Sequence, residues 1–285
     1  MFPDFLCIGA QKSGTTWLYR NMQQHPDIWL PPIKEIHFFD KYWNKTNLFS
    51  IIFTKIWRRQ LRNRIRKRYG YRDFRNLKWD FKFFFRNHTA EWYSSIFKCA
   101  GNKKTGDFTP GYSTLDSNQV AFVEKLIPNA KIIFLMRNPI YRAWSQIRME
   151  ARKCSLDLND HDIIFKKIDS NRIRLRGDYL RTLDNWHSYY QKGQMFIAFF
   201  EQVITCQKDL LLQIYKFLGI NDSPEIIPDT IRHNYNPGIE AKIPPAIASH
   251  LANLHFEDIK KLNKMFGGYT DNWLAHAEEI LKNTR

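Results

Sequence analysis

The chain of 285 residues has few cysteines, fewer acidic than basic residues and no long apolar run. Its cysteines, Cys7, Cys99, Cys154 and Cys206, lack C-x-x-C and other metal-ligand spacings, which argues against a zinc site and a disulfide-stabilised scaffold. No stretch approaches the roughly 20 apolar residues of a membrane-spanning helix, and a strand-like run starts at Phe5, which leaves no room for a signal peptide. We therefore expect a cytoplasmic protein without a bound metal, and one disulfide stays compatible with the cysteines.

The shortage of acidic residues gives the chain a net charge of +16, from 44 Lys and Arg against 28 Asp and Glu. Much of the excess lies between Lys55 and Arg86, where basic residues alternate with aromatic ones, inside an expected insertion or lid at about residues 44–90. Such a surface is suited to an anionic sugar or an anionic membrane and, less well, to nucleic acid. A helical hairpin with a solvated basic face and a homo-oligomer contact are the alternatives.

Apolar runs alternate with helical patterns along the chain, which predicts an α/β fold. We expect strands at residues 5–10, 104–108, 131–137 and 194–201. Helices are expected at residues 15–24, 118–126, 139–153, 175–191, 208–218 and 245–266. The length fits a single domain, residues 1–285, with a central, mostly parallel sheet flanked by helices.

The segment G-A-Q-K-S-G-T-T-W, residues 9–17, joins an apolar strand to a helical pattern. In this context successive backbone N–H groups and a helix N-terminus form a cradle for a phosphate, and Lys12 adds a positive charge. The Walker motif needs Lys directly after its second Gly, whereas Gly14 is followed by Thr15. The segment therefore predicts a phosphate cradle that does not act on a γ-phosphate, and a plain turn with a solvated Lys12 is the alternative.

Three further segments contain candidate site residues, one on a loop and two at strand ends. K-E-I-H-F-F-D occupies residues 34–40, and G-D-F-T-P-G-Y occupies residues 106–112. R-N-P-I-Y-R-A-W-S, residues 137–145, follows a second buried strand pattern, and Pro139 suits the first turn of a helix. The planar guanidinium of Arg137 matches phosphate oxygens.

These segments resemble the motifs of sulfotransferases that use 3′-phosphoadenosine-5′-phosphosulfate (PAPS). K-S-G-T-T-W is similar to the phosphosulfate loop of the cytosolic enzymes, and K-E-I-H-F-F is similar to a motif of heparan-sulfate-type and bacterial enzymes. The segment from Arg137 to Ser145 resembles their R-x-P-x-x-R-x-x-S motif. The resemblance covers most of the chain, most strongly its first half, and implies a P-loop-like sulfotransferase fold.

The resemblance implies a PAPS site that releases the bisphosphate PAP. Arg137 and Ser145 would bind the 3′-phosphate, and Trp17 would stack on adenine unless it is a core residue. We expect Arg142 to lie on a solvated helix face. Gly238 and Lys242 only partly match the C-terminal phosphate loops of the family. The phosphosulfate itself would be held by the loop residues Gln11, Lys12, Ser13, Gly14, Thr15 and Thr16.

The resemblance also implies that Glu35 is the general base, with Lys12 neutralising charge on the leaving phosphate. We expect the apolar neighbours of Glu35 at positions 36, 38 and 39 to desolvate it in part and to raise its basicity. His37 is a catalytic candidate and, with Asp40, either a support for the base or an acceptor contact.

Two residues of the fourth segment are weaker acceptor-site candidates. Asp107 is a second acid or base, or a structural carboxylate at a strand end. Phe108 stands where the family often has Lys, which puts a heparan-like acceptor in doubt and indicates an apolar neighbourhood.

The predicted reaction moves a sulfuryl group from PAPS to a hydroxyl, less readily an amine, of a carbohydrate, lipid or small molecule. A kinase-like phosphotransferase and a non-enzymatic polyanion binder acting through Lys55–Arg86 are the alternatives. A Golgi lumenal location would follow if a membrane anchor preceded this sequence.

Overall fold

The computed structural model describes residues 1–42, 58, 61–64, 77–233, 235 and 242–283. Within these residues a five-stranded parallel sheet has the order β2-β3-β1-β4-β5. Its strands are β1 (Phe5–Gly9), β2 (Ile28–Trp29), β3 (Lys104–Phe108), β4 (Lys131–Met136) and β5 (Met195–Phe199). The predicted single α/β fold is therefore confirmed.

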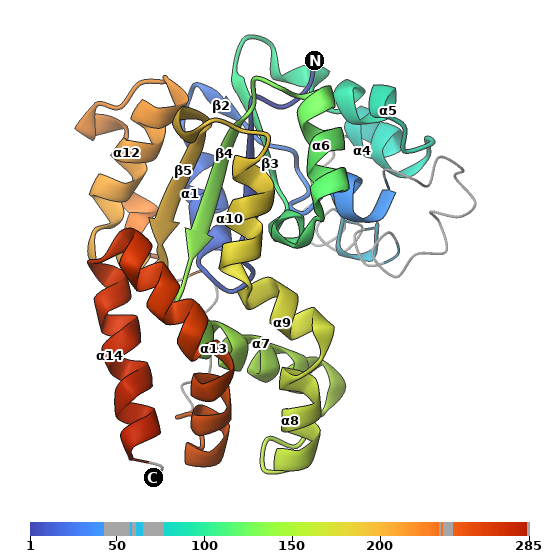
Figure 1. Cartoon of the computed structure of the whole chain (residues 1–285). Helices are drawn as coiled ribbons and strands as arrows, with labels where there is room; N and C mark the ends of the chain where they lie inside the picture. The colour runs from blue at the N-terminus through green and yellow to red at the C-terminus, as the bar shows by residue number, and fades with distance from the viewer. Residues whose placement is uncertain (43–57, 59–60, 65–76, 234, 236–241, 284–285) are drawn as a thin grey trace.

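Helices cover both faces of the sheet (Figure 1). In the first half of the chain they are α1 (Thr15–Met22), α4 (Leu77–Phe84), α5 (Ala90–Ser95) and α6 (Ser117–Leu126). They continue with α7 (Pro139–Cys154), α8 (His161–Ile168), α9 (Asn171–Gly177) and α10 (Tyr179–His187). The last are α11 (Phe200–Thr205), α12 (Gln207–Leu218), α13 (Pro245–Phe266) and α14 (Tyr269–Lys282). None of the described helices is long and apolar enough to cross a bilayer.

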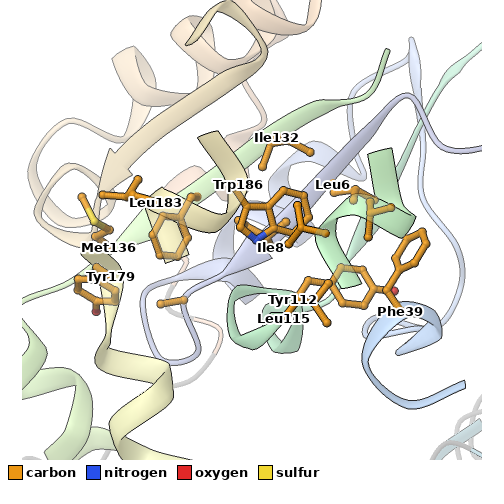
Figure 2. Close-up of a cluster of buried hydrophobic side chains, with 14 of the residues drawn as sticks. Leu6, Ile8, Phe39, Tyr112, Leu115, Ile132, Met136, Tyr179, Leu183 and Trp186 are labelled. Atoms are coloured by element: carbon orange, nitrogen blue, oxygen red, sulfur yellow. The ribbon is translucent and has the colours of Figure 1, made fainter. Parts of the chain in front are cut away.

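The strands supply two separate apolar clusters because their side chains alternate between the faces. Leu6 and Ile8 of β1 enter the larger cluster with Ile132 of β4, beside Trp186 and Leu183 of α10 (Figure 2). The other face holds the second cluster, which contains Phe5 and Cys7 of β1, Phe108 of β3, and Ile133 and Leu135 of β4. Burial on both faces explains why these strands are continuous apolar runs in the sequence.

The expected elements differ from the structure in a few places. The helix predicted at residues 175–191 is two helices, because Asp178 leaves helical geometry and its Oδ1 accepts from Arg181 N (3.1 Å) as the N-cap of α10. The helices α8 and α14 were not predicted, and β2 is only two residues long. All four cysteines carry free thiols.

The carboxyl ends of the strands point towards the part of the molecule formed by α7, α8 and α9 (Figure 1). Parallel strands place their following loops at one edge, and the connections after β1, β3 and β4 meet there. The three loops follow neighbouring strands of the sheet, with β1 in the middle. This edge is the place to look for a site.

A buried carboxylate holds the loops together at the end of β3. Asp107 accepts hydrogen bonds from the hydroxyls of Tyr93 (2.9 Å), Tyr112 (2.7 Å) and Thr109 (2.7 Å). The Tyr112 hydroxyl accepts from Phe38 N (3.1 Å), and Thr109 Oγ1 accepts from His37 N (3.4 Å). Asp107 therefore anchors the backbone of residues 37 and 38 through two hydroxyls. Burial raises the pKa of Asp107 to about 6, although the three hydrogen bonds act in the opposite direction.

Replacing Asp107 with Ala should leave three hydroxyls without their common acceptor. We expect Asp107→Ala to lower the free energy of unfolding by at least about 1–3 kcal/mol, the cost of an unsatisfied buried polar group. Urea denaturation at neutral pH measures this difference. Asp184→Ala removes an exposed carboxylate of α10 and should change stability by no more than about 0.5 kcal/mol. Equal stability of Asp107→Ala and wild type would contradict the anchoring role.

Candidate active site

The connection from β1 to α1 has the geometry of an anion cradle. Gly14 caps α1 with a left-handed backbone (φ 88°), and no side chain caps the helix, so the first-turn N–H groups keep their donor capacity. A Cβ at Gly14 would lie 3.1 Å from Val203 Cγ2, so the turn needs glycine for both space and conformation. Lys12 also has positive φ (76°), as in concave backbone turns that bind anions.

Positive charges gather around Lys12. Burial, followed by the charges of Arg152, Arg137, Lys153 and Arg148, lowers the pKa of Lys12 to about 8. Three of these four cations belong to α7, and Arg137 directly follows β4. Because the cations disfavour one another, their common neighbourhood is suited to a ligand with several negative charges.

Arg137 is fixed beside the cradle. Its Nη1 donates to the carbonyl oxygen of Lys12 (3.1 Å), and its guanidinium lies over the ring of Phe200 (4.2 Å). The Tyr179 hydroxyl donates to the Arg137 carbonyl (2.8 Å) and fixes the end of β4. Ser145 shares a face of α7 with Arg148, one turn away. The structure thus brings Arg137 to the loop, while the contact predicted for Ser145 stays a prediction.

Trp17 is 6% exposed and packs in the smaller apolar cluster. Its Nε1–H donates to the carbonyl oxygen of Ile231 (2.7 Å) in the turn η6 (Asp229–Arg232). These contacts place Trp17 as a core residue, which was one of the two roles expected for it. Its stacking on adenine stays a prediction.

Glu35 lies at the same edge of the sheet. Its backbone N–H donates to the carbonyl oxygen of Phe108 (3.0 Å), at the end of β3. Glu35 Oε1 lies 3.5 Å from Lys34 Nζ, which also donates to Thr15 Oγ1 (3.3 Å) in α1. Lys34 therefore links the candidate base to the cradle. Its sequence position directly before Glu35 was the only signal for this role.

The surroundings of Glu35 are more polar than expected. Ile36, Phe38 and Phe39 point into the core, each 1% exposed, whereas the Glu35 side chain keeps 30% of its exposure. Its Oε2 lies 3.5 Å from Nε2 of His37. The Glu35 side chain is thus partly buried, as predicted, and the raised basicity expected for it stays a prediction. Left-handed backbone at Glu35 and His37 (φ 68° and 63°) turns the two polar side chains away from the core.

His37 connects Glu35 to Asp40. Its Nδ1 lies 2.9 Å from Asp40 Oδ2, and Asp40 belongs to the helical turn η1 (Phe38–Tyr42). Burial acts to lower the pKa of His37, but hydrogen bonds to Asp40 and Glu35 outweigh it and raise the pKa to about 9. His37 is therefore an imidazolium at neutral pH, held between two carboxylates. Asp40 is largely buried (8% exposed), which makes it a support for His37.

The remaining residues that the sequence suggested for the site lie in the core, on the surface or outside the described residues. Asp107 and Phe108 are 0% and 2% exposed, and Asp107 has the contacts of a structural carboxylate, one of the two roles expected for it. The acceptor contacts of both side chains stay predictions. Gly238 lies outside the described residues, and Lys242 is exposed directly after that gap. Most of the segment from Lys55 to Arg86 also lies outside the described residues, so its role stays a prediction.

Arg142 was expected on a solvated helix face, and this prediction is wrong. Its side chain is fully buried, with Nη1 donating to Gln146 Oε1 (2.9 Å) and Nη2 to the Ile173 carbonyl (3.0 Å). The helix α9 covers this face of α7, and no local periodicity reveals such a non-local contact.

Sequence reasoning also missed Arg176 of α9. Its Nη1 donates to Gln11 Oε1 in the cradle (2.5 Å), across 165 residues of sequence. The site therefore combines residues from four separate parts of the chain.

Comparison with known proteins identifies the family. A model of the sulfotransferase family matches residues 3–224. The chain is 23% identical over 240 residues to human bifunctional heparan sulfate N-deacetylase/N-sulfotransferase 1, covering 78% of this chain and 22% of that protein. It is 23% identical over 273 residues to human carbohydrate sulfotransferase 15, covering 78% of this chain and 45% of that protein. The chain thus spans less than half of each of these relatives.

Solved structures share the fold. A sulfotransferase from Alicyclobacillus acidocaldarius superposes with a TM-score of 0.66 at 19% identity, covering 96% of this chain and 99% of the other. The sulfotransferase domain of the Synechococcus PCC 7002 olefin synthase gives a TM-score of 0.56 at 17% identity, covering 87% and 86%. With the match over residues 3–224, these likenesses lead to one conclusion: the chain belongs to the sulfotransferase family.

Proposed function

We propose that this chain transfers a sulfuryl group from PAPS to a hydroxyl group of a carbohydrate or small-molecule acceptor. The cluster of cations around Lys12, at the uncapped start of α1, is the observation that carries the proposal. Relatives whose names specify heparan sulfate and carbohydrate support the acceptor class. An amine and a lipid hydroxyl are the secondary acceptor classes.

The described residues fit a donor with phosphates at two positions. The cradle from Gln11 to Thr16 would hold the 5′-phosphosulfate through backbone N–H groups and the Lys12 charge. Arg137 and Ser145 would hold the 3′-phosphate, because Arg137 is fixed beside the cradle and Ser145 follows it on α7. Trp17 would border the adenine.

Two residues of the chain perform the chemistry in this proposal. When bound, PAPS supplies a sulfuryl group attached to a phosphate that can leave. Lys12 stabilises the negative charge that develops on that phosphate oxygen, from a position fixed before the reaction starts. Glu35 accepts the proton of the acceptor hydroxyl, and its partial exposure leaves it accessible to an acceptor.

His37 has a supporting role. Its imidazolium lies between Glu35 Oε2 (3.5 Å) and Asp40 Oδ2 (2.9 Å). It therefore orients the Glu35 carboxylate, and Asp40 fixes the ring. This arrangement leaves Glu35 Oε1, near Lys34, as the oxygen that faces the cradle side of the site.

Binding of PAP tests the donor assignment. A concentration of about 100 times the dissociation constant should stabilise the fold by roughly 2.7 kcal/mol in a thermal-shift assay. Lys12→Ala and Arg137→Ala should each raise the dissociation constant measured by calorimetry about 10- to 100-fold, through loss of a charge-assisted hydrogen bond. Lys125→Ala, on the exposed face of α6, should bind PAP normally.

Two other outcomes would favour the alternative functions. A response to ATP with Mg²⁺ alone would favour the phosphotransferase. Steeply salt-dependent binding to polyanions without PAP binding would favour the polyanion binder.

The general-base assignment is tested at Glu35. Glu35→Gln should lower turnover by roughly 10²- to 10⁴-fold and leave PAP affinity unchanged, because the amide cannot accept the proton. Transfer of labelled sulfate from PAPS to a carbohydrate panel measures turnover. Glu91→Gln changes an exposed carboxylate on α5 and serves as the matched control. Near-normal turnover of Glu35→Gln would remove Glu35 from the mechanism.

The charge of His37 should be visible as a pH-dependent stability. A pKa raised to about 9 in the folded state, against about 6.5 when unfolded, stabilises the fold fully below pH 6.5. This contribution is lost as the pH rises through 9 and is on the order of 3 kcal/mol. Urea denaturation of wild type and His37→Gln between pH 6 and 9.5 should show a difference that shrinks with pH. A constant difference would mean that His37 is neutral in the folded protein.

A further inference from the structure

Arg176 approaches the cradle from α9, a helix that packs against α7. It lies near the end of α9, one residue before the buried Gly177, and its side chain is only partly exposed. Nη1 donates to Gln11 Oε1 over 2.5 Å, and Gln11 directly precedes Lys12 in the cradle. The guanidinium is therefore held at the Gln11 end of the cradle, away from the first turn of α1.

Among the described residues, no Asp or Glu forms an ion pair with Arg176. Its hydrogen bond to Gln11 ends on a neutral amide oxygen. Burial, and then the charges of Arg172 and Arg142, lower its pKa to about 10, whereas Glu150 and Glu35 raise it. A partly desolvated cation without a counter-charge is costly, and a bound anion would offset that cost.

Arg176 is related to both halves of the proposed reaction. Its guanidinium contacts Gln11 of the donor cradle, and the negative charge of Glu35, the proposed base on the acceptor side, helps to raise its pKa. Phe108, which ends β3, has an uncharged side chain and supplies no cation at this edge of the sheet. In the proposed reaction, the sulfuryl group lies between Lys12 and Glu35 during transfer, within reach of the Arg176 guanidinium.

We infer that Arg176 is a further catalytic residue that binds the oxygens of the sulfuryl group during transfer. The inference rests on the proposed function. In the step, the bond between sulfur and the acceptor oxygen forms while the bond between sulfur and the phosphate oxygen breaks. The electron pair stays on the phosphate oxygen beside Lys12, and the acceptor proton moves to Glu35. The guanidinium fork, already oriented by Gln11, donates to the sulfuryl oxygens and holds the group in line between the two oxygens as one bond forms and the other breaks.

The difference between PAPS and PAP provides a test that does not depend on the acceptor, because only PAPS carries the sulfuryl group. Calorimetry should show that Arg176→Ala raises the dissociation constant of PAPS about 10-fold or more, the loss of one charge-assisted contact, and that of PAP less than about twofold. Arg176→Lys should recover part of the PAPS affinity, because it keeps the charge without the fork. Arg174→Ala, an exposed arginine of the same helix, should match wild type for both ligands.

Turnover adds a second measurement. Arg176→Ala should lower the rate constant at saturating PAPS by about 10²- to 10³-fold, as for loss of an oxyanion-binding donor. Equal weakening of PAPS and PAP would assign Arg176 to the phosphate or to folding and overturn the inference. Unchanged PAPS affinity with a higher KM for the acceptor would overturn it in favour of acceptor binding. Failure of the wild type to bind PAP would instead refute the proposed function itself. If Arg176→Ala melts well below wild type, Arg176→Gln replaces it in the same comparison.

Discussion

The repulsion among cations around Lys12 is the constraint on which the rest of the site depends. Two like charges about 8 Å apart repel by roughly 2 kcal/mol at an effective dielectric constant near 20. Arg152 and Lys153 of α7 are exposed, so solvent screens their part of this repulsion. Arg137 is held close to Lys12 by its contacts with the Lys12 carbonyl and the ring of Phe200. The parallel sheet supplies the rigidity, because β1 and β4 are neighbours with both faces buried.

Backbone strain in the segment that carries Glu35 is a second constraint. Two non-glycine residues, Glu35 and His37, adopt left-handed backbone, which costs on the order of 1–3 kcal/mol each. The hydroxyls bound to Asp107 and the hydrogen bond from Glu35 N to Phe108 O offset this cost. The strand β3 thus supports the candidate base through Asp107 and the Phe108 carbonyl oxygen.

The sequence predicted those features that arise from local patterns. The double-sided burial of β1 and β4 produces unbroken apolar runs, and the spacing of Gly14 and Lys12 is sufficient to indicate a cradle. The burial of Arg142 and the approach of Arg176 to Gln11 depend on where α9 packs, and a polar helix of seven residues gives no periodic signal for that. The partial burial of Glu35 followed from its apolar neighbours, whereas its polar contacts depend on left-handed backbone that the sequence does not reveal.

The order of strands in the sheet has a consequence for how the site comes into being. β1 sits between β3 and β4, strands that follow it by about a hundred residues, and Arg176 reaches Gln11 from farther still. Such long-range pairings form slowly, because large loops must close before any contact offsets their entropy. No N-terminal segment alone contains the cradle, the candidate base and the surrounding cations. Catalytic competence therefore arises only with the last stages of folding, when the central strand has acquired both of its neighbours.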